Sequence, residues 1–139
     1  MKKISRNGFL GFVAGMAALP AGTASASNLD YCALFIPQQI AVLVKKPMKP
    51  VPPDPARPIR GCEWRSIDGK SRVIAEAAVG TGQKAYAGAS PTGGRQAGAL
   101  SQGMFYSVRV EPAIDEELVT AFLNEFILRS ERAGRGTAQ

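Results

Sequence analysis

Six prolines within sixteen residues constrain the fold of this 139-residue chain more than any other feature. They lie in the basic stretch 45–60. Proline has a fixed φ and no backbone N–H, so this stretch is excluded from helices and interior strands. We expect an extended, polyproline-like surface segment. It is either a stiff linker, the favoured interpretation, or a preorganised ligand for a partner. In the second interpretation, the partner contacts would include Pro47, Pro50, Pro52 and Pro53.

The residues before this segment, 30–46, are predicted to contain a short helix. Pro37 suits the first helical position, where the missing N–H costs nothing. Ile40 and Leu43 then belong to an apolar face, and two lysines follow at the end that the helix dipole favours for positive charge.

The residues after it alternate between apolar and polar side chains, which is typical of strands. An Asp68-Gly69 pair marks a hairpin turn, and a second hairpin turns at 101–103. In its return strand, Phe105 shares a face with Ser107 and Arg109. The Gly-rich stretch 80–94 is expected to form irregular loops. The pattern predicts about four strands, at 62–66, 71–79, 95–100 and 104–110.

Residues 113–132 give the clearest helical pattern in the chain. Acidic residues fill the first turn and arginines the last, as the helix dipole favours. The acidic turn has the composition of a metal site, but dipole compensation is the simpler explanation. Residues 134–139 are expected to form a flexible tail. The predicted buried stripe consists of Leu118, Val119, Phe122, Leu123, Phe126 and Ile127.

The first 26 residues are typical of a secretory signal peptide. Basic residues precede an apolar run at 9–19, and Ala24-Ser25-Ala26 matches the small-x-small cleavage pattern. The alternative is a membrane anchor, but the run is shorter than the roughly 20 residues that span a bilayer. Asn7 stands where a twin-arginine signal has its second arginine, which favours the Sec route. We therefore predict a periplasmic or secreted protein with no transmembrane segment after cleavage.

Cleavage would also change the charge. It leaves 113 residues and removes three of the 17 basic residues and none of the 11 acidic ones, so the net charge falls from +6 to +3. A charge of this size on a small domain serves solubility. We expect no nucleic-acid partner, and a single α+β domain over 27–133.

Cys32 and Cys62 are the chain's two cysteines. In an oxidising compartment such a pair normally forms a disulfide. The alternative, a reactive thiol pair, is disfavoured because the spacing is not Cys-x-x-Cys and no histidine is present to lower a thiol pKa.

The absence of histidine also excludes Ser-His-Asp and Cys-His catalysis and imidazole metal ligation. We expect no cofactor and no metal site. Trp64, the single tryptophan, is most simply a core residue, with ligand stacking as the alternative. Trp64 and Tyr86 are the aromatic candidates for partner contacts. The stretch 80–84 lacks the spacing of a phosphate-binding loop.

Three short motifs carry a resemblance to a known family. They are the opening Asp30–Ala41, with its Asp-x-Cys-x-Leu and Pro37, then Cys62-Glu63-Trp64, and Gly80–Tyr86 with Gly-x-Gly-x-x-Ala-Tyr. Together they resemble a family of small exported bacterial domains of unknown function, whose actinobacterial members are mostly lipoproteins. The resemblance implies a Cys32–Cys62 disulfide and an α+β fold with an N-terminal helix and a long C-terminal helix packed on an antiparallel sheet. It implies no activity. The chain departs from the family at Ile36, in its Pro-rich insertion and in lacking a lipidation cysteine.

These observations favour an exported, non-enzymatic binding or accessory module of the bacterial cell envelope. The sheet face or the stretch 80–94 would contact an envelope protein or a cell-wall component. A small periplasmic hydrolase without histidine, built on Ser-Lys or paired carboxylates, is the alternative. A third possibility is a structural accessory that docks through its Pro-rich segment.

Overall fold

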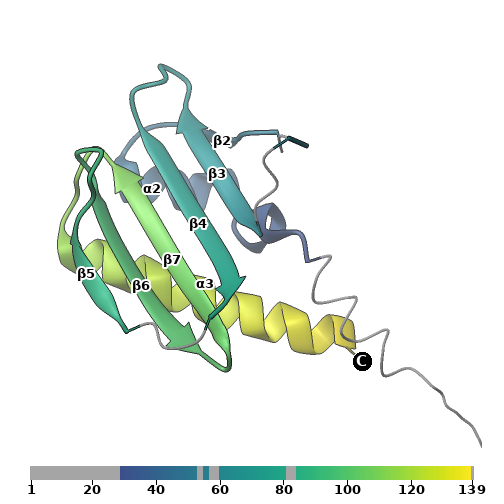
Figure 1. Cartoon of the computed structure of the whole chain (residues 1–139). Helices are drawn as coiled ribbons and strands as arrows, with labels where there is room; N and C mark the ends of the chain where they lie inside the picture. The colour runs from purple at the N-terminus through teal and green to yellow at the C-terminus, as the bar shows by residue number, and fades with distance from the viewer. Residues whose placement is uncertain (1–28, 53–54, 57–59, 81–83, 139) are drawn as a thin grey trace, which may run out of the picture. The chain divides into compact units, whose positions relative to one another are not determined.

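The computed structural model describes residues 29–52, 55–56, 60–80 and 84–138 (Figure 1). Residues 30–131 form one unit, in which all strands belong to a single antiparallel sheet. The signal sequence predicted over 1–26 lies outside the described residues. The strands, in sheet order, are β2 (Met48–Pro50), β3 (Gly61–Ser66), β4 (Arg72–Val79), β7 (Met104–Glu111), β6 (Arg95–Ser101) and β5 (Tyr86–Ala89).

The α+β class is confirmed, but the sheet has six strands and not about four. One additional strand, β2, lies inside the Pro-rich segment and pairs with β3. Met48 is buried, so this part of the segment is not a free polyproline-like surface. A strand is possible there because β2 is an edge strand, where a proline without an N–H is tolerated.

The other additional strand, β5, lies in the stretch that was expected to be irregular. It pairs with β6 in the register Tyr86↔Gly98 to Ala89↔Arg95 and forms the second edge of the sheet. Its sequence, Tyr-Ala-Gly-Ala, has little intrinsic preference for a strand. Pairing with β6 provides the backbone partners that the local sequence does not specify.

Three helical elements cover one face of the sheet: η2 (Tyr31–Leu34), α2 (Pro37–Val44) and the part of α3 (Glu116–Ala138) that runs to residue 131. Figure 1 shows α2 and α3 behind the strands. The alternation predicted for β4 and β7 places Val73, Ala75, Tyr106 and Val108 under these helices. Trp64 lies in the same layer, with its ring centroid 6.2 Å from that of Phe35. The core therefore lies between one sheet face and the helices.

The long helix differs from its prediction at both ends. It begins at Glu116 and continues to Ala138, whereas the sequence pattern predicted a helix over 113–132. Val119, Phe122, Leu123 and Phe126 are buried as predicted, whereas Leu118 is 46% exposed. Leu118 therefore lies outside the buried stripe of the helix, next to the fully buried Val119.

The predicted disulfide between Cys32 and Cys62 is confirmed, with the two Cα atoms 5.0 Å apart. It joins η2 to β3. Asp30 caps η2, because its carboxylate accepts a hydrogen bond from the Cys32 N–H at 3.1 Å. At the start of α2, Ile36 has no capping oxygen, and its own N–H donates to the Gln39 side chain at 3.0 Å. In the part of the chain that the structure describes, no helix is long and apolar enough to cross a membrane.

Candidate binding face

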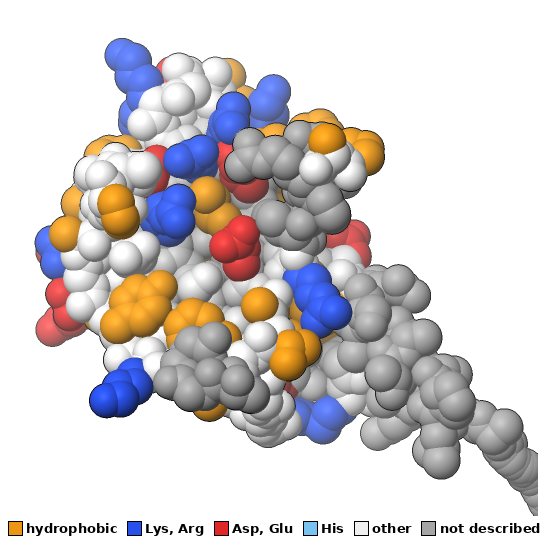
Figure 2. Space-filling model, in the orientation of Figure 1, with side chains coloured by type: hydrophobic (Ala, Val, Ile, Leu, Met, Phe, Trp, Pro, Cys, Tyr) orange, Lys and Arg blue, Asp and Glu red, His pale blue; other side chains and the backbone are white. Residues whose placement is uncertain are grey.

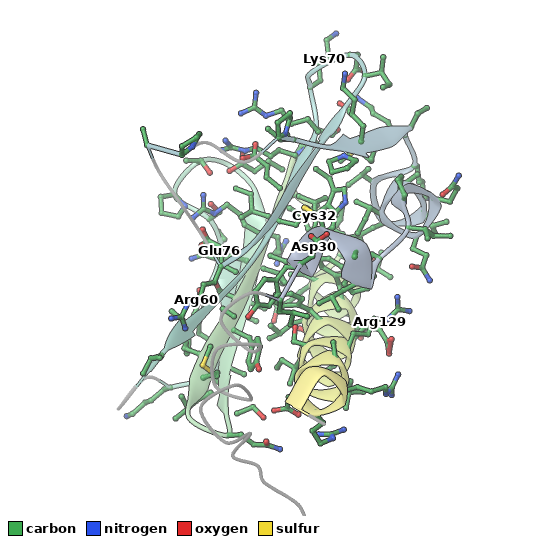
Figure 3. All side chains as sticks on the ribbon, turned by 90° about the vertical axis from the view of Figure 1, so that its right-hand side faces the viewer. Asp30, Cys32, Arg60, Lys70, Glu76 and Arg129 are labelled. Carbon is green, nitrogen blue, oxygen red and sulfur yellow. A yellow bond between two sulfur atoms is a disulfide. The ribbon has the colours of Figure 1, made fainter. Side chains whose placement is uncertain are left out.

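The sheet face opposite the helices is the candidate functional site. In the described residues no helix covers it, and Figure 2 views the molecule from this side. Figure 3 shows the two sides, with Arg129 on the helix side and Glu76 on the opposite side of the sheet. The strand register aligns side chains on this face in rows that cross the sheet. The central row is Glu76, Ser107, Gly98 and Tyr86, from β4 to β5.

One end of this face carries an aromatic pair, of which Tyr86 is exposed and Phe105 is half-buried. The rings of Tyr86 and Phe105 are nearly parallel, with an interplanar angle of 18° and centroids 6.1 Å apart. Leu100 pairs with Phe105 in the register and lies beside them. Tyr86 and Leu100 are each 41% exposed. The result is an apolar patch formed by β5, β6 and β7, in the region where Figure 2 shows hydrophobic side chains clustered at the lower left.

Gly98 determines how the pair is placed. A Cβ atom at this position would lie 2.6 Å from Cε1 of Tyr86 and 2.7 Å from Cζ of Phe105, closer than carbon atoms approach. Both rings therefore occupy space that any other residue at position 98 would fill. The glycine lets two aromatic side chains from different strands converge on β6.

The other end of the face is polar, and its arginines and glutamates are paired. Arg65 Nε donates to Glu63 at 2.7 Å, and Arg72 Nη2 donates to Glu111 at 3.0 Å. Thr92 also donates to Glu111. Burial raises the pKa of Glu111, but the hydrogen bonds from Thr92 and Arg72 outweigh it and lower the pKa below its ordinary value. Arg65 and Arg72 are therefore already paired with glutamates.

Between the two ends lie polar side chains with unused hydrogen-bonding capacity. Glu76 and Ser107 are neighbours in the central row, and Arg109 and Gln96 are neighbours in the next one. None of the four makes a side-chain hydrogen bond within the described residues. The Nε atom of Arg109 is buried without such a partner. This band offers a carboxylate, a hydroxyl, an amide and a guanidinium beside the aromatic pair.

Comparisons with models of protein families, with curated proteins and with solved structures found no match. Function is therefore inferred from the residues of this face.

The structure separates the contact residues predicted from the sequence. Tyr86 lies on the open face, at the β5 edge. Trp64 is 0% exposed, so its place in the core argues against a partner contact and corrects that prediction. Pro47, Pro50 and Pro52 are exposed beside or within β2, at the opposite edge of the sheet from Tyr86. Pro53 lies outside the described residues.

Phe105 and Gly98 were missed as site residues, as were Leu100 and the polar side chains of the band beside the rings. The sequence contained a signal for Phe105, because its predicted alternation already placed an aromatic ring on the polar face of its strand. Gly98 gave no such signal. Its role depends on the β5–β6 register, which brings Tyr86 opposite it.

The acidic first turn of α3 has a structural explanation. Glu116 accepts from Arg95 Nη1 at 3.1 Å, which ties the helix start to β6. Among the residues that the structure describes, no cluster of three or more candidate ligands could hold a metal ion.

Proposed function

We propose that this chain is an exported, non-enzymatic binding or accessory module of the bacterial cell envelope, and that the open sheet face is its binding surface. The observation that carries the proposal is the Tyr86–Phe105 pair, held at the surface above Gly98. Covering a large exposed aromatic side chain removes much apolar surface from water. An exposed Tyr86 against a half-buried Phe105, beside polar side chains that make no hydrogen bond within the described residues, is typical of a surface that becomes covered.

Export is supported by the signal-like residues 1–26 and by the Cys32–Cys62 disulfide, because disulfides persist in oxidising compartments. Intact-mass measurement of the protein from fractionated cells tests this step. We expect a chain that begins at Ser27, recovered from the periplasm or the medium. A chain that retains Met1 and stays in the cytoplasm would contradict it.

A binding role is favoured over catalysis by the residue chemistry. The chain contains no histidine. On the open face, Glu63 and Glu111 form ion pairs with arginines. These carboxylates are therefore not free to act as a general acid or base on a substrate. The polar side chains beside the rings make no hydrogen bond within the part of the chain that the structure describes, which suits recognition of a ligand's polar groups.

Photo-crosslinking in living cells tests the location of the binding surface. A benzophenone side chain replaces Tyr86 or Leu100 on the open face. Matched controls replace Leu128, which is 51% exposed on α3, or Val42 on α2. We expect an envelope component to be trapped from positions 86 and 100 and not from 128 or 42. Equal trapping from all four positions, or trapping only from the helices, would refute the proposal.

A further inference from the structure

We propose that the open face binds a sugar chain of the cell wall, with Tyr86 and Phe105 stacked on pyranose rings and the adjacent polar band hydrogen-bonded to their hydroxyl groups. This inference rests on the proposed function, because it names the ligand class of the same face.

The aromatic pair provides the apolar half of the recognition. A pyranose ring exposes C–H groups on its faces, and covering them with an aromatic ring removes apolar surface of both partners from water. Tyr86 and Phe105 are offset and not stacked face to face, because their centroids are 6.1 Å apart. Neither ring therefore covers the other fully. Two adjacent rings extend the platform, which suits a chain of sugars better than a single one.

The polar band provides the other half. Glu76 can accept hydrogen bonds, Arg109 can donate them, and Ser107 and Gln96 can do both. A sugar hydroxyl is both donor and acceptor, so it can pair with any of these groups.

The charge of the face favours a neutral ligand over a polyanion. A site for single-stranded nucleic acid combines aromatic rings with a strongly positive groove. Here the charges nearly balance, and Arg65 and Arg72 are already paired with glutamates. A proline-rich peptide also docks on aromatic rings, but it offers few hydrogen-bonding groups to the polar band. The charged strand residues on this face are four basic ones, Lys49, Arg65, Arg72 and Arg109, and three acidic ones, Glu63, Glu76 and Glu111.

The test uses chitotetraose, a short chain of β-linked N-acetylglucosamine, titrated into the purified, oxidised, ¹⁵N-labelled protein. We expect NMR shift changes confined to β5, β6, β7 and the adjoining part of β4. Tyr86→Ala and Phe105→Ala should each weaken binding about tenfold, the effect of losing one aromatic contact. Leu128→Ala on α3 is the matched control and should bind as the wild type does.

The Gly98→Ala variant tests whether the positions of the two rings matter for binding, because both rings are still present in it. The three atoms nearest to the new Cβ belong to the two side-chain rings and not to the backbone, so the rings can move and the strand pairing can persist. We expect a folded protein with weaker chitotetraose binding, although both rings remain. Glu76→Gln should reduce the affinity less than Tyr86→Ala does, since it keeps one hydrogen-bonding group.

Three results would overturn the sugar inference. They are the absence of shift changes at millimolar chitotetraose, shift changes confined to the helices, and binding of an oligoproline peptide or an oligothymidylate at this face in place of the sugar. Crosslinking from position 86 distinguishes this failure from that of the proposed function. A trapped protein partner without sugar binding refutes only the sugar, whereas no trapping and no sugar binding refute both.

Discussion

The guanidinium carbon of Arg129 lies 4.4 Å from the centre of the Phe35 ring. The same side chain donates through Nη1 to the Leu34 carbonyl at 2.8 Å and to Gln39 at 3.0 Å. Its Nε donates to Glu125 at 2.9 Å, one turn earlier on α3. Arg129 therefore links α3 to the segment that connects η2 with α2. Its side chain lies on the helix side of the molecule (Figure 3).

Replacing Arg129 with alanine should destabilise the fold by about 2 kcal/mol, since the cation–π contact with the buried Phe35 ring and the hydrogen bond to the half-buried Leu34 carbonyl are lost together. Urea denaturation followed by circular dichroism measures the change. Arg129→Lys should recover only part of it, because an ammonium group cannot stack flat on Phe35 and reach both oxygens. Glu125→Ala serves as the control and should cost much less, as an exposed i,i+4 pair contributes little. Equal losses for Arg129→Ala and Glu125→Ala would contradict this role.

The segment that Arg129 fastens was only partly predictable. Pro37 at the first position and the apolar Ile40 indicated α2, because both are local features. Arg129 itself was read as a dipole partner at the end of α3, and its contact with Phe35 spans more than ninety residues. Such long-range contacts leave no local pattern. Helix α3 and strand β4 were predictable because their buried faces produce a local sequence pattern. Phe122 and Phe126 have helical spacing in α3, and Val73 and Ala75 have the two-residue spacing of one strand face in β4.

The Cys32–Cys62 disulfide closes a loop with a sequence separation of 30 residues. Cross-linking a loop of this length should stabilise the protein by about 3–4 kcal/mol, mainly by restricting the unfolded chain. The double variant Cys32→Ala/Cys62→Ala should therefore unfold at a much lower urea concentration. Adding reductant should lower the midpoint of the wild type to near that of the variant and leave the variant unchanged. A reductant effect of similar size in both proteins would show that it acts elsewhere.

Trp64 should report on the core and not on a ligand. It is the single tryptophan, fully buried, and its indole N–H has no hydrogen-bond partner among the described residues. We expect blue-shifted fluorescence that iodide quenches poorly, with a red shift on unfolding. Trp64→Ala should cost about 3–5 kcal/mol. Trp64→Phe should cost clearly less, because it keeps most of the ring and removes the unpaired donor. Strong iodide quenching of the folded protein would contradict this placement.

The candidate face was harder to predict than the fold. The alternation in β7 placed Phe105 among polar residues, yet nothing in the sequence paired it with Tyr86. That pairing depends on β5, whose Ala and Gly residues have weak strand preferences, and on the register that sets Gly98 beneath both rings. Trp64 attracted the ligand-stacking hypothesis because it is aromatic and single. Its position in β3, on the helix side, is fixed by packing against Phe35.

Asp68 should make stability depend on acid pH. In the β3–β4 turn its carboxylate accepts from the Ser66 hydroxyl at 2.6 Å, the Lys70 N–H at 3.0 Å and Lys46 Nζ at 3.1 Å. These hydrogen bonds, that from Ser66 first, hold the pKa of Asp68 well below its ordinary value of 3.8. The unfolded state therefore takes up this proton at a higher pH than the folded state does. The contribution of the ionised Asp68 carboxylate to folding stability is present above about pH 4 and is lost as the pH falls below that value. Melting temperatures between pH 2 and 7 should fall less steeply in acid for Asp68→Asn than for the wild type. Identical acid slopes would contradict the assignment.

Tyr106 should have the converse effect in alkali. Its ring packs edge-on against Phe126, with centroids 5.7 Å apart. Burial, with smaller contributions from the Glu131 charge and from Tyr31, raises the pKa of Tyr106 from 10.0 to about 12. Between these values the unfolded chain loses the phenolic proton while the folded protein keeps it, so stability falls as the pH rises. Below about pH 10 the contribution is fully present. Tyr106→Phe removes the titrating group and keeps the ring, so urea midpoints measured from pH 8 to 11.5 should decline less steeply above pH 10 in the variant. The two proteins should differ little in slope below that pH. A variant whose alkaline decline matches the wild type would show that another group controls it.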